Sequence, residues 1–252
     1  MMLRFAAPAL TSLALLSAPA HALDLTNMSD AERAAFGEQV RAYLLENPEI
    51  IVEAIDVLEQ QQQQATALAD QELVQANADA LFNDGYSWVG GNPEGDITLV
   101  EFMDYRCGYC RRAVPEVASL LAEDGNIRLV IKELPILGEA SVLSSRFAVA
   151  TKQVAGDDAY KQVHDALLEF GGDVSEVTLR RLSDGLGLDS DAIVAAMDSD
   201  AVSAEIAKTR ELAQQLNISG TPSFVLGTEM LRGFLPADQM QQIADGVRAE
   251  KG

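Results

Sequence analysis

The chain has 252 residues, with 39 acidic and 18 basic side chains, and its formal net charge at neutral pH is -21. So acidic a protein is repelled by nucleic acid and by anionic membrane surfaces, and we exclude both as partners. The length suits one domain of roughly 150 to 200 residues with a smaller appended segment.

The first 22 residues have the features of a signal peptide. Arg4 precedes an apolar run over residues 5–16 that is too short to span a bilayer, and Ala20-His21-Ala22 has the small residues of a cleavage site. We predict cleavage after Ala22 and export of the remaining chain to the periplasm.

Residues 23–85 read as an N-terminal helical segment. Ser29 and Glu32 have the spacing of a capping box, which begins a helix that Asn47-Pro48 ends near residue 45. Pro48 begins a second helical stretch that extends to residue 82, and its inward positions recur at spacings of three and four residues. These positions are Ile51, Ile55, Leu58, Gln62, Ala65, Ala69, Leu73, Ala76 and Ala80.

Two interpretations of this second helix remain open. Its near-heptad spacing favours association with further copies of the chain through residues 48–82, which makes the protein a homo-oligomer. Alternatively, the helix lies on its own domain or stays mobile, because alanines bury little area and the run from Gln60 to Gln64 is of low complexity.

Residues 86–252 have the pattern of an α/β domain. Turn formers from Gly90 to Gly95 mark its beginning, and only helical patterns occur between residues 138 and 216. Strands are predicted at 97–103, 127–133, 223–226 and 229–234, and helices at 107–123 and from Pro236 onward. This order predicts a mixed sheet with an all-helical insertion.

Both cysteines lie in one short stretch, Asp104 to Cys110, with two residues between them. A disulfide across so short a loop removes little entropy from the unfolded chain, so a purely structural bridge is a poor interpretation. Zinc usually takes four ligands, and the only histidine left after signal cleavage is His164, which we expect to be an ordinary surface residue. Arg111 stands where haem attachment requires histidine. A reversible dithiol is therefore the favoured interpretation.

Cys107 is placed to react first. At the N-terminus of its predicted helix, its thiolate faces unpaired backbone N–H groups and the positive end of the helix dipole. Three arginines crowd the same stretch and also favour the thiolate. We expect Cys110, one turn into the helix, to be the resolving thiol. The three arginines are Arg106, Arg111 and Arg112.

Glu101 stands in the apolar run 97–102, six residues before Cys107. A carboxylate in such a strand either lies on an exposed edge or is buried with a raised pKa. In the second case it can accept a proton from Cys110 during exchange. We therefore assign a catalytic role to Glu101 as well as to the two cysteines.

The motif FMDYRCGYC, with Ser219-Gly220-Thr221-Pro222 far downstream and directly ahead of a strand, resembles the DsbA-like thiol-disulfide oxidoreductases of bacterial periplasms. The resemblance covers about residue 97 to the C-terminus and implies the thioredoxin fold. It also implies that Pro222 is cis and faces the cysteines, and that Thr221 contacts bound peptide. A cis proline leaves neighbouring backbone groups free to pair with an extended substrate. With Tyr109, these two residues form the predicted substrate-binding set.

The resemblance implies secreted or periplasmic proteins as substrates and a membrane protein as redox partner, with no organic cofactor and no metal. The N-terminal helices make the architecture most similar to the copper-sensitivity-suppressor branch of the family. Because the sequence has no cluster of methionine or histidine that supports copper binding, we do not expect this chain itself to bind copper.

The direction of electron transfer stays open. The strongest oxidases of the family have Pro-His between the cysteines, whereas this chain has Gly108-Tyr109, which resembles the periplasmic disulfide isomerases. Oxidase, isomerase and reductase activity therefore all remain as interpretations. A different class of function is an oligomeric periplasmic holdase chaperone in which the cysteines are secondary.

Overall fold

A computed structural model describes residues 26–251, so the predicted signal peptide lies outside the described residues. The chain divides into two compact units, residues 1–59 and 60–252. Helix α2 begins in the first unit and ends in the second. The helices are α1 Asp30–Glu46, α2 Glu49–Ala76, α3 Ala78–Phe82, α4 Gly108–Asp124, α5 Glu139–Ala155, α6 Asp157–Glu169, α7 Glu176–Gly185, α8 Ser190–Ala196, α9 Asp200–Gln215 and α10 Ala237–Lys251. The strands are β1 Trp88–Gly91, β2 Ile97–Met103, β3 Ile127–Glu133, β4 Ser223–Leu226 and β5 Glu229–Arg232.

In the first unit, helix α1 begins at the predicted capping box. The Ser29 backbone N–H donates to Glu32 Oε2 at 2.8 Å, and the Glu32 N–H donates to Ser29 Oγ at 3.4 Å. No residue of α1 is buried, although the helix carries large apolar side chains. The unit therefore has helical structure but leaves its apolar side chains facing solvent. Those exposed in this unit are Phe36, Val40, Tyr43, Leu45, Ile51, Val52, Ile55, Val57 and Leu58.

The last turns of α2 belong to the second unit. Val74 is 1% exposed and packs in an apolar cluster with residues of β2, β3 and β4. Asp70 accepts a bidentate pair of hydrogen bonds from Arg232 at the end of β5. The C-terminal end of α2 therefore packs on its own domain, which was one of the two interpretations of this helix. The earlier part of α2 remains exposed.

The predicted continuous helix over residues 48–82 is interrupted at Asn77. The Asn77 side chain donates to the Leu73 carbonyl oxygen at 2.9 Å and so competes with the backbone ladder. A short helix α3 then follows, and it buries Leu81 completely against the sheet.

The five strands form one mixed sheet in the order β1-β3-β2-β4-β5. Strands β2 and β3 are parallel, and the other neighbours are antiparallel. The residues between β3 and β4 form helices α5 to α9, without a strand among them. The predicted fold class, a thioredoxin fold with a helical insertion and an N-terminal helical appendage, is confirmed.

Strand β1 was not predicted, because its sequence ends in two glycines that are typical of turns. Gly91 has φ +65°, and a Cβ there would lie 2.5 Å from the Ile127 carbonyl oxygen. Position 91 therefore requires glycine because the two strands approach closely there, and not because the chain makes a turn. Trp88 begins the strand and lies opposite Ile131 in register.

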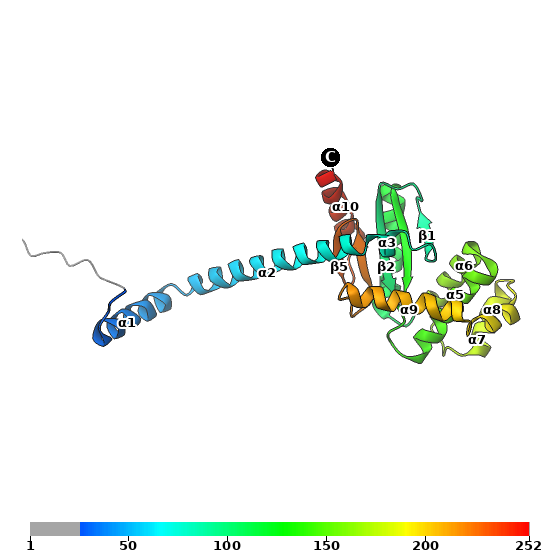
Figure 1. Cartoon of the computed structure of the whole chain (residues 1–252), viewed down its shortest axis with the longest axis horizontal. Coiled ribbons are helices and arrows are strands. Elements are labelled where there is room, and N and C mark those ends of the chain that lie inside the picture. The colour runs from blue at the N-terminus through cyan, green and yellow to red at the C-terminus, as the bar shows by residue number, and fades with distance from the viewer. Residues whose placement is uncertain (1–25, 252) are drawn as a thin grey trace, which may run out of the picture. The chain divides into compact units, whose positions relative to one another are not determined.

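Two apolar clusters cover the two faces of the sheet, and Figure 1 shows the helices that supply them. The larger cluster joins one face to α4, α10 and the inserted helices, and it includes both cysteines. The smaller one joins the other face to α3, the end of α2 and the last turns of α9. The redox motif consequently lies on the sheet face that the insertion also covers.

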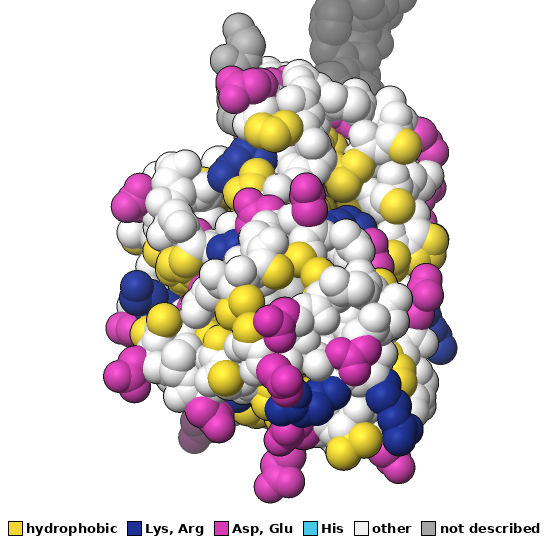
Figure 2. Space-filling model, turned by 90° about the vertical axis from the view of Figure 1, so that its right-hand side faces the viewer, with side chains coloured by type: hydrophobic (Ala, Val, Ile, Leu, Met, Phe, Trp, Pro, Cys, Tyr) yellow, Lys and Arg dark blue, Asp and Glu magenta, His cyan; other side chains and the backbone are white. Residues whose placement is uncertain are grey.

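Acidic side chains are spread among apolar ones over the face drawn in Figure 2, in keeping with the net charge of -21. Among residues 26–251, no helix combines the length and apolar character that crossing a membrane requires.

Candidate active site

The redox motif lies between the end of β2 and the start of α4. Cys107 is the N-cap residue of α4, with extended backbone angles, and Cys110 lies in the first turn. The backbone N–H of Cys107 donates to the Asp104 carbonyl oxygen at 3.0 Å, which closes the turn that leads into the helix. This turn places Cys107 at the helix N-terminus, where unpaired N–H groups favour an anion.

The two cysteines are reduced and differ in accessibility. Cys107 is 7% exposed, whereas Cys110 is completely buried. Burial raises the pKa of the Cys110 thiol far above its usual range, and the charges of Cys107 and Glu101 raise it further. Cys110 therefore needs a nearby base before it can act as a nucleophile, while an external partner can reach only Cys107.

Asp104 fixes the turn from inside the protein. Its buried carboxylate accepts from the backbone N–H of Arg106 at 2.8 Å through Oδ1. Through Oδ2 it accepts from the N–H groups of Ile136 and Leu137, at 2.8 and 3.0 Å. Since Ile136 and Leu137 follow β3, this one side chain ties the redox loop to the neighbouring strand end.

The three arginines of the motif have separate contacts. Arg106 donates to the Gly172 carbonyl oxygen at 3.2 Å, and Arg111 donates to that of Phe170 at 2.8 Å. Both therefore connect the redox loop to the segment between α6 and α7. The Arg112 guanidinium lies 5.0 Å from the centroid of the Tyr109 ring, so it is held over an exposed aromatic face.

Glu101 is buried at the centre of the sheet. Strand β2 has neighbours on both sides, so the alternative of an exposed edge strand does not apply. The side chain is 8% exposed and lies on the face covered by α4. Burial, and then repulsion by Glu133, raises the pKa of Glu101 to about 8. A carboxyl with this pKa exchanges protons readily near neutral pH.

A second buried acid, Glu133, ends β3 and was not identified from the sequence. It lies opposite Met103 in register, on the same face of the sheet as Glu101. Its carboxylate accepts from the hydroxyls of Tyr105 at 2.6 Å, Tyr160 at 2.7 Å and Ser145 at 2.7 Å. Burial nevertheless raises its pKa to about 7. The available signal was an acid in an otherwise apolar strand, as it was for Glu101.

The prediction that His164 is an ordinary surface residue is wrong. His164 is 8% exposed, and its Nδ1 lies 3.0 Å from the Tyr105 hydroxyl. Its ring also stacks on Tyr160, with centroids 5.6 Å apart. Burial lowers the pKa of His164 to about 4, so the ring is neutral at neutral pH. His164 is buried because it lies on the inward face of α6. One residue in a sequence does not show which face of a helix will be inward.

The Thr221-Pro222 segment faces the redox motif. Its peptide bond is cis, and the Cys107 thiol donates to the Thr221 carbonyl oxygen at 3.1 Å. The Thr221 hydroxyl has no hydrogen-bond partner among the described residues. Tyr109, between the cysteines, is 57% exposed. The structure thus brings Thr221 and Pro222 to Cys107, and it leaves Tyr109 on the surface beside them.

One thiol at a helix N-terminus, a second, buried thiol in the first turn and a cis proline on a mixed sheet are the features of a thioredoxin-like redox site. The chain belongs to the family described as the DSBA-like thioredoxin domain, which matches residues 98–247. Residues 32–65 match a second family, the copper resistance protein ScsC N-terminal domain.

Solved structures agree with this assignment. A thioredoxin-like oxidoreductase from Silicibacter pomeroyi is 44% identical, with TM-score 0.63, and the match covers 69% of this chain and 98% of that one. Proteus mirabilis ScsC in a transitional conformation is 26% identical, with TM-score 0.64, and the match covers 88% of this chain and 100% of that one. The second match is longer because it includes part of the N-terminal helical segment.

One curated relative is a much longer protein than this chain. The Na+/H+ antiporter NhaA 3 of Salinispora tropica is 31% identical over 136 residues, which are 54% of this chain. The chain covers only 21% of that relative's length.

Proposed function

We propose that the chain is an exported thiol-disulfide oxidoreductase that acts on disulfides or thiols of secreted proteins through Cys107 and Cys110. The observation that carries this proposal is the arrangement of the two thiols. Cys107 is the accessible one and lies against Thr221-Pro222, whereas Cys110 is buried with Glu101 among its electrostatic neighbours. Export follows from the predicted signal peptide, residues 1–22.

The reaction proceeds in two exchanges. In the reducing direction the Cys107 thiolate attacks a substrate disulfide, so that a Cys107–substrate disulfide forms and the other substrate sulfur leaves as a thiolate. Cys110 then loses its proton to ionised Glu101 and attacks Cys107, which releases the reduced substrate and leaves a Cys107–Cys110 disulfide. Oxidation of a substrate dithiol is the exact reverse, with protonated Glu101 returning the proton to Cys110. A membrane redox partner resets the pair.

We assign the substrate-binding surface to Thr221, Pro222 and Tyr109. The unpaired Thr221 hydroxyl beside Cys107 is available to a bound peptide. Around the motif, Tyr109, Ile136 and Leu137 expose between 41% and 57% of their area. Such a surface suits extended, partly unfolded chains, which present apolar side chains and free backbone groups.

The decisive experiment traps the intermediate. A reduced Cys110→Ala variant should accumulate a mixed disulfide when it is incubated with a disulfide-bonded client protein or with oxidised glutathione, because the attacked sulfur then leaves as a thiolate, and mass spectrometry should place the mixed disulfide on Cys107. The matched Cys107→Ala variant should accumulate none, because Cys110 is buried. Equal trapping by both variants would contradict the proposed order of attack.

The reduction potential of the pair then gives the direction. It is measured by equilibration with glutathione buffers and the mass shift on alkylation. A potential as oxidising as that of the periplasmic oxidants assigns disulfide donation. A clearly more reducing potential assigns isomerase or reductase activity.

A second function is favoured by the exposed apolar side chains of the N-terminal segment, which we propose assemble the chain into a homo-oligomer. Ile51, Ile55 and Leu58, at the predicted helical spacing, are each at least 49% exposed. Val74 and Leu81 are buried against their own domain, so the associating surface lies in α1 and in α2 before residue 70. If this assembly acts mainly as a holdase, a Cys107→Ser, Cys110→Ser variant should suppress client aggregation as well as the unaltered chain does.

A further inference from the structure

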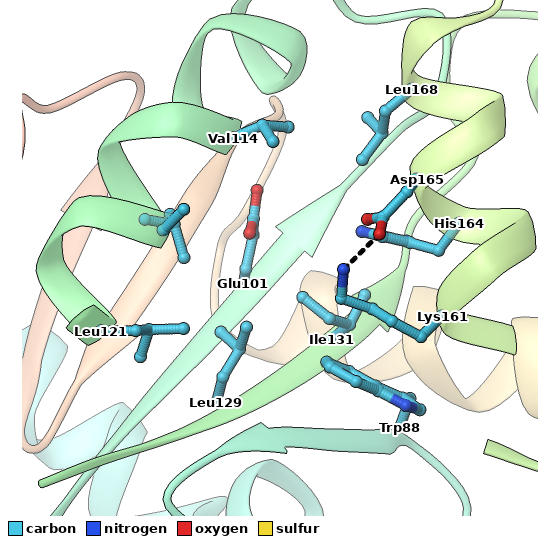
Figure 3. Close-up of a pocket in the computed structure, with 12 residues that line it drawn as sticks. Trp88, Glu101, Val114, Leu121, Leu129, Ile131, Lys161, His164, Asp165 and Leu168 are labelled. Atoms are coloured by element: carbon cyan, nitrogen blue, oxygen red, sulfur yellow. Dashed lines mark hydrogen bonds and ion pairs between the residues drawn. The ribbon is translucent and has the colours of Figure 1, made fainter. Parts of the chain in front are cut away.

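A cavity lies between helices α4 and α6 above the sheet, beside the redox motif but outside it. Its volume is about 110 Å3, and Figure 3 shows α4 side chains on one side of it and α6 side chains on the other. Most of the lining is apolar, with the Trp88 ring of β1 at one end. The apolar lining residues are Trp88, Val114, Val117, Ala118, Leu121, Leu129, Ile131 and Leu168.

One polar group reaches the cavity without a partner. Glu101 stands up from β2 between the α4 side chains and Leu168 of α6 (Figure 3). The residue is 8% exposed, and its carboxyl has no hydrogen-bond partner among the described residues. Burying a polar group without a partner costs free energy, so this carboxyl favours any occupant that supplies a hydrogen bond.

Three other polar lining residues make contacts of their own. His164 Nδ1 faces the Tyr105 hydroxyl, and Lys161 forms an ion pair with Asp165 on the next turn of α6. Lys161 and Asp165 each remain 47% exposed, which places the pair at the solvent side of the cavity. Glu101 is therefore the lining carboxyl that has no hydrogen-bond partner among the described residues, and it lies at the buried side.

We propose that this cavity is a binding site for a small, uncharged amphiphile, with one aromatic ring or a branched chain of similar size and a carbonyl oxygen that accepts a hydrogen bond from Glu101. For comparison, an enclosed apolar cavity of roughly 150 Å3 holds a benzene molecule. The present cavity is smaller but opens to solvent, so one end of the ligand extends into the mouth.

Charge excludes the alternatives. An anion would be repelled by Asp165 in the lining and by Glu133, whose charge acts on Glu101, whereas a cation would have to leave water for a lining that is mostly apolar. Because the pKa of Glu101 is raised to about 8, its carboxyl is protonated at neutral pH and donates a hydrogen bond. The acceptor of that bond is what distinguishes the expected ligand from a plain hydrocarbon.

The test measures binding in a Cys107→Ser, Cys110→Ser variant, so that its outcome does not depend on the proposed thiol chemistry. Acetophenone is the probe, cumene is the probe of similar shape that lacks the acceptor, and benzoate is the charged probe. Methyl NMR signals of Val117, Leu121 and Leu168 report on the cavity at pH 6.5. We expect acetophenone to shift these signals saturably, and to bind about tenfold more tightly than cumene or benzoate.

Two matched substitutions on α4 locate the site. Ala118 is exposed at the cavity mouth, so Ala118→Phe should block it and weaken acetophenone binding at least tenfold. Ala122→Phe makes the same change one turn later, outside the lining, and should leave the affinity unaltered. Glu101→Leu should remove the preference for acetophenone over cumene. Unshifted cavity methyl signals, equal binding to both alanine variants, or an unchanged preference in Glu101→Leu would overturn the proposal.

Discussion

We propose that Glu101 accepts the proton of Cys110, because burial raises the pKa of that thiol. Since the pKa of Glu101 is about 8, the fraction of ionised carboxylate grows as the pH rises toward that value. The release of glutathione from a Cys107 mixed disulfide should therefore accelerate between pH 6 and pH 8. In Glu101→Gln this rise should be lost and the rate at pH 8 should fall about 100-fold. Stopped-flow kinetics of glutathione release measure the pH dependence in both proteins. Superimposable pH–rate profiles of the unaltered chain and Glu101→Gln would contradict the proposed role of Glu101.

The same residue should make stability depend on pH. A carboxyl whose folded-state pKa is raised binds its proton more tightly in the folded chain, so stability is lost as the pH rises from its usual pKa near 4.5 toward 8. Glu101→Gln removes this loss and should stabilise the protein at pH 7 by on the order of 2 kcal/mol. At pH 4 the two proteins should differ little. Urea unfolding at pH 4 and pH 7 measures the difference in the free energy of unfolding between the two proteins. An equal difference at the two pH values would contradict this prediction.

Residues that lie close together in the sequence were the ones whose mutual positions could be predicted. Cys107 and Cys110 share one helical turn, whereas the place of Thr221-Pro222 opposite them was expected only from the family resemblance. Glu133 was missed because its donors, Tyr105, Tyr160 and Ser145, lie 28, 27 and 12 residues away and meet it only after the insertion has packed. Such contacts leave no local pattern in the sequence.

At the scale of elements, helix α2 changes character along its length. Val74 is 1% exposed against the sheet, whereas Leu68 is 63% exposed. Val74→Ala should destabilise the second unit by about 1 to 2 kcal/mol, because it removes buried methyl groups from a packed cluster. Leu68→Ala is the matched control and should change the stability by less than about 0.5 kcal/mol. Denaturant unfolding followed by Trp88 fluorescence measures both, and equal losses would show that Val74 has no special packing role.

The elements themselves were largely predictable, since helices and strands have strong periodic patterns. The exceptions have local physical causes. Strand β1 was not predicted because Gly90 and Gly91 are also typical of a turn. The helix break at Asn77 was not predicted because it depends on one side chain, which donates to the Leu73 carbonyl oxygen. The end of α2 illustrates a further limit, because periodicity shows that a helix has an apolar face but does not identify what that face contacts.

At the scale of the whole molecule, association through the N-terminal segment should depend on its apolar positions. Ile55→Asp with Leu58→Asp should shift the protein to monomers in sedimentation velocity experiments, because charges are then placed on the contacting face. Gln61→Asp with Gln64→Asp adds the same charge on exposed positions nearby and serves as the control. If both pairs weaken association equally, repulsion between acidic copies rather than loss of apolar contact explains the result.

The hydrogen bonds to Glu133 have a consequence for how the second unit unfolds. Their donors come from the redox loop, from α5 and from α6, so one strand end holds the sheet and the insertion together. The larger apolar cluster also continues from the sheet into α7 and α8. The insertion consequently has no separate core with which to unfold alone, and the two parts should lose structure in one cooperative transition. Native-state hydrogen exchange should then give α5 and β3 the same opening free energy.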